Sequence, residues 1–170
     1  MKQHAKQQII SFIALTLLLI SHPGVAKPRI AILNFELNDI TSLPNTIQEQ
    51  QRTASIQPLL QQALLLIDSF EIIEISTNAE TTANAGLGYL FSHHDLAAKL
   101  GEQFGADWVI VGQHSKPSFL YSYLIADLVE VKSQRLVSRF NIELKGNHAK
   151  VTQHGVAALA DKIANRLIEQ

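Results

Sequence analysis

The chain has 170 residues, no cysteine, and 14 Lys and Arg residues against 15 Asp and Glu residues, which gives a formal net charge of −1. The absence of cysteine excludes disulfide bonds and thiolate chemistry, so the stability of the fold must come from its core. The balanced charge excludes the basic face of a nucleic-acid-binding protein, and no block of like charges indicates a charged tail.

The beginning of the chain has the three parts of a secretory signal peptide. Residues 1–8 are polar and basic, residues 9–20 are almost entirely apolar, and residues 21–26 end in small side chains. The apolar run is shorter than the ~20 residues that a transmembrane helix needs. We therefore predict that residues 1–26 are removed by cleavage between Ala26 and Lys27, that the protein is exported, and that the processed chain has no membrane span.

The remaining residues, 27–170, are predicted to form one α/β domain. Five segments have the apolar runs or the alternation typical of β-strands, and they are residues 29–35, 70–75, 108–112, 119–131 and 136–145. Three segments have apolar side chains at helical spacing, and they are residues 55–67, 95–104 and 152–168. The order β-α-β-α-β-β-β-α predicts a single five-stranded mixed sheet with helices packed on it, parallel in its first three strands and ending in an antiparallel hairpin.

Two segments between these elements lack a clear period. Residues 38–53 are polar and contain Pro44, which predicts a loop or a weak helix. Residues 76–92 are rich in Thr, Asn, Ala and Gly, and they predict a long loop that ends where Asp95 caps the next helix. Long loops in compact domains tend to be functional or mobile.

Several strand segments connect this sequence with known domains. Residues 28–35 (PRIAILNF), 70–73 (FEII) and 105–112 (GADWVIVG) together resemble the N-terminal domain of the Tol–Pal periplasmic propeller protein. Related domains occur in the curli secretion lipoprotein and in the outer-membrane lipoproteins that activate penicillin-binding proteins. Residues 115–118 (SKPS) and 143–147 (ELKGN) are similar to a family of small secreted bacterial proteins of unknown function.

This resemblance implies a mixed-sheet α/β domain that works in the bacterial periplasm as a non-catalytic partner of another protein. It supplies no catalytic residue. The sequence differs from the pattern of these relatives in two respects. The relatives commonly carry a glycine in the last hairpin, where this chain has Ser133 and Gln134. The lipoprotein relatives carry an anchoring cysteine, which is absent here.

The topology predicts where a site would lie. In open parallel sheets, ligands bind outside the carboxyl ends of the strands. The segments 36–52, 76–94, 113–118 and 146–151 are expected to emerge at that edge and to form a common rim, with Asp39 and Asp95 close by. The candidate ligand-binding residues on this rim are His93, His94, His114, Lys116, Asn147 and His148.

Two interpretations of the rim are open. Neutral imidazole is a common metal ligand, so the histidines favour an accessory protein that binds a metal or a small anionic ligand. Alternatively, surface loops simply collect polar residues, and no pair of histidines has the spacing that places two ligands on one helical face. Lys116 and Asn147 are either turn-forming residues or contacts for a partner. No metal or cofactor is assigned to the sequence.

The remaining chemistry-bearing patterns do not define an enzyme. The pair Gly86 and Gly88 lacks the third glycine of a phosphate-binding loop and does not directly follow a strand. Ser115 follows His114 directly, and adjacent strand residues point to opposite faces. The sequence therefore favours a non-catalytic periplasmic binding or adaptor domain that acts through protein contacts at its sheet edge or rim.

Overall fold

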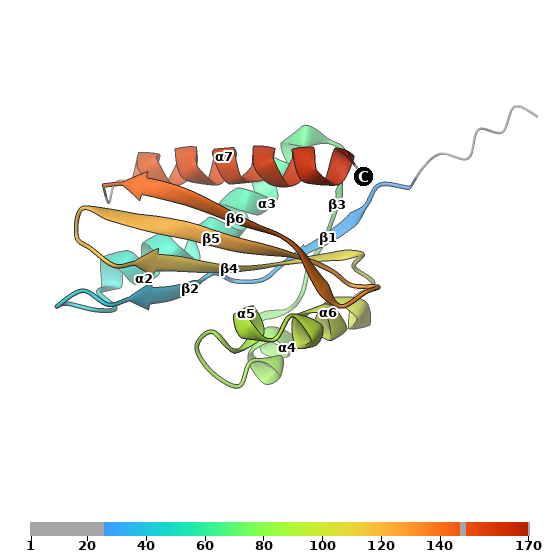
Figure 1. Ribbon diagram of the computed structural model, residues 1–170, viewed down its shortest axis with the longest axis horizontal. Coiled ribbons are helices and arrows are strands. Elements are labelled where there is room, and N and C mark those ends of the chain that lie inside the picture. The colour runs from blue at the N-terminus through green and yellow to red at the C-terminus, as the bar shows by residue number, and fades with distance from the viewer. Residues whose placement is uncertain (1–25, 147–148, 170) are drawn as a thin grey trace, which may run out of the picture.

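The computed structural model describes residues 26–146 and 149–169, which form one mixed sheet flanked by helices (Figure 1). The elements follow one another as β1 (Arg29–Ile32), β2 (Glu36–Asp39), α2 (Ile47–Ala54), α3 (Ile56–Ile67), β3 (Glu71–Ile73), α4 (Thr77–Ala83), α5 (Tyr89–Ser92), α6 (His94–Gln103), β4 (Trp108–Lys116), β5 (Tyr121–Glu130), β6 (Arg135–Lys145) and α7 (Ala149–Ile168). No helix among the described residues is both long and apolar enough to cross a membrane.

The strands form a sheet in the order β3-β1-β4-β5-β6, with β2 pairing beside β4. Strand β1 runs parallel to β3 and β4, whereas β5 and β6 return as an antiparallel hairpin. Strand β2 continues the line of β1 along β4, where Glu36 pairs with Gln113 and Asp39 with Lys116. The predicted α/β class and mixed sheet are confirmed, and the sheet has one strand more than the five expected.

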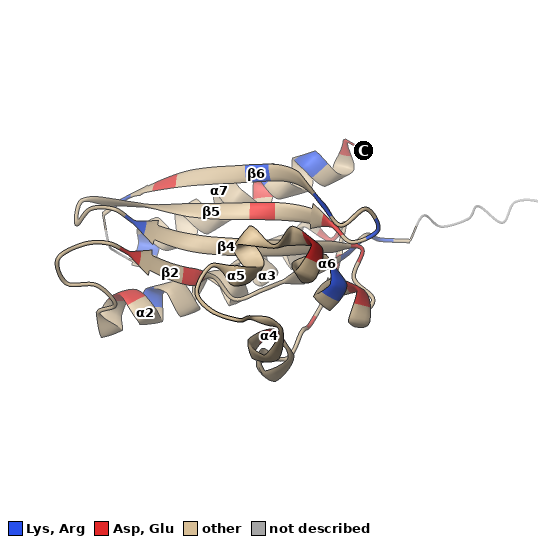
Figure 2. Ribbon diagram, turned by 60° about the horizontal axis from the view of Figure 1, so that its bottom comes forward, with Lys and Arg blue, Asp and Glu red and all other residues tan. Residues whose placement is uncertain are grey.

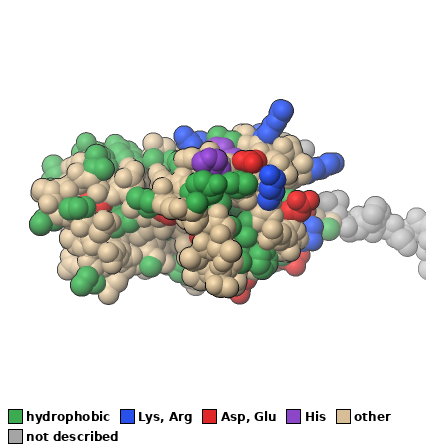
Figure 3. Space-filling model, turned by 90° about the horizontal axis from the view of Figure 1, so that it is seen from below, with side chains coloured by type: hydrophobic (Ala, Val, Ile, Leu, Met, Phe, Trp, Pro, Cys, Tyr) green, Lys and Arg blue, Asp and Glu red, His purple; other side chains and the backbone are tan. Residues whose placement is uncertain are grey.

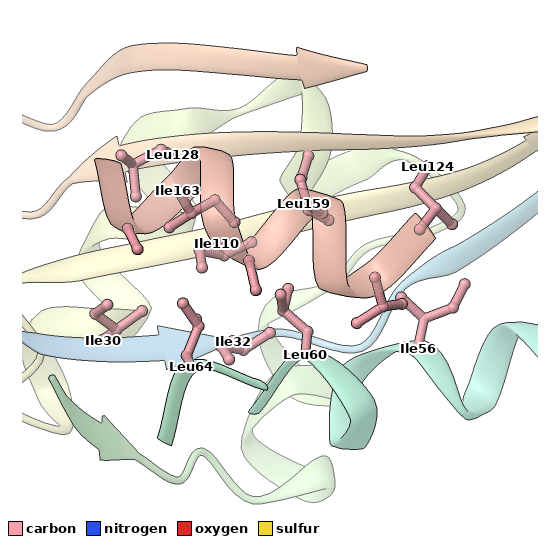
Figure 4. Packing of buried hydrophobic residues seen from close by; sticks show 14 of the residues in the cluster. Ile30, Ile32, Ile56, Leu60, Leu64, Ile110, Leu124, Leu128, Leu159 and Ile163 are labelled. Atoms are coloured by element: carbon pink, nitrogen blue, oxygen red, sulfur yellow. The ribbon is translucent and has the colours of Figure 1, made fainter. Parts of the chain in front are cut away.

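Helices cover both faces of the sheet. Helices α2, α3 and α7 pack on one face, which we call the α7 face, and α4, α5 and α6 pack on the other, the α6 face (Figures 1 and 2). Figure 4 shows isoleucine and leucine side chains from β1, β4, β5, α3 and α7 pointing toward one another between the sheet and the helices. The cluster on the α6 face is smaller and consists largely of alanine and valine.

The structure corrects several predicted boundaries. Strand β4 runs on to Lys116, so residues 113–116 are strand and not loop. The segment 76–92 contains helices α4 and α5, and the polar segment 38–53 contains the end of β2 and all but the last residue of helix α2. The helix predicted from Asp95 begins one residue earlier, with His93 at its N-cap position.

Local side-chain chemistry explains two of these unexpected helices. Thr46 accepts a hydrogen bond from the backbone N–H of Glu49 and so caps α2. Ser76 caps α4 in the same way, through the backbone N–H of Ala79. Both caps satisfy a backbone donor that would otherwise lack a partner in the first turn.

The two ends of the elongated molecule differ. Strand β1 begins and helix α7 ends at the same end, whereas the 40–46 loop and the 117–120 turn lie at the opposite end (Figure 1). The helices α4, α5 and α6 cover only the half of their sheet face nearer to the chain ends (Figure 2). The other half of the α6 face is bare, and Asn141, Glu143 and Lys145 of β6 are exposed there.

Candidate functional site

The side chain of His114 lies within the domain and not on its surface. It points from β4 to the α7 face, where it is fully buried. Its Nδ1 is 2.7 Å from Thr53 Oγ1 of α2, and its Nε2 is 3.0 Å from Ser122 Oγ of β5. Burial, with the positive charge of Arg52 as the next cause, lowers the pKa of His114 to about 4. His114 is therefore a neutral link between α2 and the sheet near pH 7.

Lys116, two residues further along β4, is also buried and is paired with two carboxylates. Its Nζ lies 3.0 Å from Glu49 Oε1 and 3.6 Å from Asp39 Oδ2. Burial alone would raise the pKa of Asp39, but hydrogen bonds from Thr41 and the charge of Lys116 bring it below its ordinary value. Lys116 thus holds α2 against the end of β2, and its ammonium group is occupied by these acids.

Arg52 completes this ion cluster and connects α2 with residues at the end of β6 and the start of α7. Its Nε donates to Thr152 Oγ1 at 2.7 Å, and its Nη2 donates to the carbonyl of Gly146 at 3.1 Å. Its Nη1 lies 3.5 Å from Glu49 Oε2. The guanidinium group therefore fixes the relative positions of α2, the end of β6 and the first turns of α7.

A groove of about 820 Å³ opens directly above this cluster, between α2, α3 and the start of α7. Its walls carry the amide side chains of Gln48, Gln51, Gln62 and Gln153. Pro58 and Leu59 contribute the apolar part of the lining, and Arg52 and Thr152 contribute the polar base. Amide groups both donate and accept hydrogen bonds, so these walls are suited to a ligand with peptide-like polar groups.

The other two described rim histidines lie on the opposite face of the sheet. His94 Nε2 is 2.8 Å from Asp127 Oδ2, and the same buried carboxylate receives two hydrogen bonds from Arg139 at 2.6 Å. His93 Nδ1 contacts the carbonyl of Tyr89 at 2.8 Å, and its ring lies 4.4 Å from the Tyr89 ring.

The predicted common rim is therefore divided by the sheet. His114 and Lys116 lie on the α7 face, and His94 lies on the α6 face with Asp127. The reason is that residues 113–116 continue β4, so that His114 and Lys116, two positions apart, share the α7 face, whereas His94 belongs to α6 on the other face. Asn147 and His148, the other two candidates, lie outside the described residues. Within residues 26–146 and 149–169, no three His, Cys, Asp or Glu side chains are arranged to hold a metal ion.

Sequence reasoning missed the partners of these residues. Glu49, Arg52 and Thr53 lie in the segment predicted as a loop or weak helix, and Thr152 was assigned only to a helix start. One signal for α2 is visible in the sequence, since Thr46 followed three residues later by Glu49 has the form of a capping box. The pairing of these side chains with β4 has no comparable signal, because it depends on contacts across more than sixty residues.

Comparison with known families identifies the group to which the chain belongs. Residues 28–163 match the DUF3280 family, which is described as a protein of unknown function (DUF2380). Because this match covers most of the chain, the protein belongs to that family. The predicted membership of an unknown-function family is thereby confirmed. No curated protein matches the chain.

Solved structures share the fold at low sequence identity. The match to LpoB of E. coli has a TM-score of 0.51 and 14% identity over 69% of this chain and 57% of that one. The lipoprotein GNA1162 from Neisseria meningitidis matches with a TM-score of 0.50 and 17% identity over 81% and 96% of the two chains. TolB from Acinetobacter baumannii matches with a TM-score of 0.50 and 16% identity over 84% and 28%. These likenesses establish the fold and include the expected resemblance to the Tol–Pal protein.

Proposed function

We propose that this protein is a non-catalytic binding domain of the bacterial periplasm that holds a segment of a protein partner in the groove between α2, α3 and α7. The observation that carries the proposal is the lining of the groove, where four glutamines surround Pro58 and Leu59. The backbone N–H and C=O groups of a peptide segment can form hydrogen bonds with the glutamine amides. The apolar side chains of the same segment can pack on Pro58 and Leu59. The predicted signal peptide supports export, and the fold is shared with a protein described as a lipoprotein.

The buried cluster below the groove supports a binding role in a second way. The carboxylates of Asp39 and Glu49 balance the positive charges of Arg52 and Lys116. His114 is neutral near pH 7. Groups held in this manner keep a binding surface rigid, and they are poor candidates for proton transfer or nucleophilic attack. The alternative function, which is to hold a metal or a small anion at a histidine rim, draws no support from the described residues because the sheet separates them.

Site-specific photo-crosslinking in the periplasm tests the proposal. A photoreactive amino acid at Gln62, an exposed groove residue, is expected to form a covalent adduct with one defined protein. The same amino acid at Gln103, an exposed glutamine of α6 on the other face, is the matched control and should not form that adduct. Gln62→Arg should abolish co-purification of the partner, whereas Gln103→Arg should retain it. Identical adducts from both positions, or none from Gln62, would contradict the proposal.

A further inference from the structure

Two neighbouring loops at the end of the molecule opposite the described chain ends expose large apolar side chains. We call this surface the apolar tip, and it consists of Ile40, Leu43, Phe119 and Leu120. Their side chains are 73%, 65%, 57% and 78% exposed. The loops are adjacent because β2 and β4 pair as far as Asp39 and Lys116, after which the N–H of Ile40 donates to the carbonyl of Lys116 at 3.2 Å.

The apolar tip contains no charged residue. Residues 40–48 and 117–126 include no Asp, Glu, Lys or Arg. The charged side chains that immediately precede these segments, Asp39 and Lys116, are buried, and Lys116 pairs with both Asp39 and Glu49. In the view of Figure 3, basic side chains gather on the opposite half of the molecule, whereas hydrophobic side chains are spread over the tip end. The tip therefore enters a medium of low dielectric constant without removing an exposed charge from water.

Several polar backbone groups of the tip have partners within the domain. The N–H of Thr41 donates to Asp39 Oδ1, and the N–H of Leu120 donates to Ser118 Oγ, both at 3.0 Å. The carbonyl of Leu120 accepts from the N–H of Gly146, also at 3.0 Å. Internal pairing of this kind is what a loop requires in order to leave water, since hydrocarbon offers no hydrogen bonds.

The shape and surroundings of the tip favour a lipid surface over a protein. Its apolar side chains project separately from two turns, and a deformable hydrocarbon layer surrounds such projections without a matching pocket. Tyr121 follows the second turn and is partly exposed, at the position where an aromatic ring meets the headgroup region. Lys145, which pairs with Tyr121 in register, and Lys150 of the first turn of α7 are exposed beside the tip, where anionic headgroups would contact them.

We propose that the apolar tip inserts into the interface of a phospholipid bilayer and docks the domain on a membrane surface. In this orientation the residues of the tip face the lipid, and the start of β1 and the end of α7 lie at the opposite end of the molecule (Figure 1). The proposal is independent of the groove, since none of the four tip residues lines it.

Vesicle co-sedimentation of the processed protein tests this docking. Vesicles of phosphatidylethanolamine with a minor fraction of phosphatidylglycerol are expected to bind the parent protein. The variant Phe119→Ser/Leu120→Ser should lower the partition coefficient at least about tenfold, because two large side chains no longer leave water. Leu66→Ser is the matched control, since Leu66 is 81% exposed on α3 and lies outside the tip, and it should change binding by less than about twofold. Failure of the parent to bind, or equal losses from both variants, would overturn the proposal.

Two further measurements separate lipid from other occupants of the tip. The protein has no cysteine, so Leu120→Cys and Leu66→Cys each accept a single environment-sensitive fluorophore. Vesicles should shift only the Leu120→Cys emission to the blue. Sedimentation velocity without lipid should give a monomer for the parent and for Phe119→Ser/Leu120→Ser. A dimer that this double variant disperses would assign the tip to a second copy of the chain and overturn the proposal.

Discussion

His114 is a polar residue that serves the fold because it stays uncharged. Both ring nitrogens have a hydroxyl partner, Thr53 on one side and Ser122 on the other. A neutral imidazole donates from one nitrogen and accepts at the other, and each hydroxyl group fits either role. The low pKa of His114 has burial as its main cause, because the charged imidazolium loses its contact with water. Protonation would also place a positive charge near Arg52 and Lys116, which lowers the pKa further.

The pKa of His114 predicts how stability depends on pH. In the unfolded chain the group titrates at its ordinary value of 6.5, whereas in the folded state its pKa is about 4. Between these values the unfolded state binds the proton and the folded state does not, so stability falls as the pH decreases from 6.5 to 4, by about 3 kcal/mol in all. Urea unfolding at several pH values should show this decline in the parent protein.

The matched substitutions for this test are His114→Gln and His154→Gln. The first removes the buried titrating group and should flatten the decline between pH 6.5 and 4. The second removes an exposed histidine of α7 and should leave it unchanged. If His114→Gln does not fold, NMR titration of the His114 ring in the parent protein measures the same pKa directly. A pKa near 6.5 would refute the expectation.

Among the elements, β4 depends on a glycine in its middle. The ring of Phe35, from the link between β1 and β2, lies over Gly112 where a side chain would otherwise stand. A Cβ at this position would approach three ring carbons much closer than van der Waals contact. The glycine therefore allows the link to run closely alongside β4, so that β2 continues beside it as a strand.

Gly112→Ala is expected to destabilise the protein by about 1–3 kcal/mol through overpacking against Phe35. Phe35→Leu alone should cost about 1 kcal/mol, because it leaves part of the ring volume empty. The double variant should lose less than the sum of the two, since the smaller side chain gives the new methyl group space. Thermal and urea unfolding of the four proteins measure the coupling, and strict additivity would show that the ring does not set the requirement.

At the level of elements, prediction from the sequence succeeded where side chains face an apolar core. The expected pattern is present in helices α3, α6 and α7, in the buried strands β1 and β4, in the partly exposed edge strand β3 and in the β5–β6 hairpin. It failed for β2 and for the last residues of β4, because the polar side chains of Asp39, His114 and Lys116 are buried through specific partners. The same failure displaced the predicted site, since a rim drawn from loop residues included two side chains that lie within the strand.

The whole molecule consists of two unequal layers on one sheet. The core on the α7 face is built from large aliphatic side chains, whereas the core on the α6 face contains mainly Ala and Val. Asp127 strengthens the weaker layer, because it is fully buried and holds both His94 of α6 and Arg139 of β6. The Arg139 guanidinium also lies 4.9 Å from the centre of the Phe91 ring of α5.

Asp127→Asn is expected to loosen one layer selectively. The change weakens a buried charged contact and should cost about 2 kcal/mol or more. Native-state hydrogen exchange should accelerate in α5 and α6 and change little in α3 and α7, since the layers meet different faces. Glu143→Gln, at an exposed position of β6, is the control and should leave both layers unchanged. Uniform acceleration throughout the chain would show that the layers open together.

The described chain begins and ends at one end of the molecule, and the two loops of the apolar tip lie at the other end (Figure 1). A linker or purification handle at the carboxyl terminus would therefore fasten the protein to a solid support in a defined orientation. Molecules immobilised in this way would all present Leu43 and Leu120 to the bulk solution. On a sensor chip prepared in this way, liposomes and dissolved proteins can be tested one after the other for binding to the exposed apolar tip.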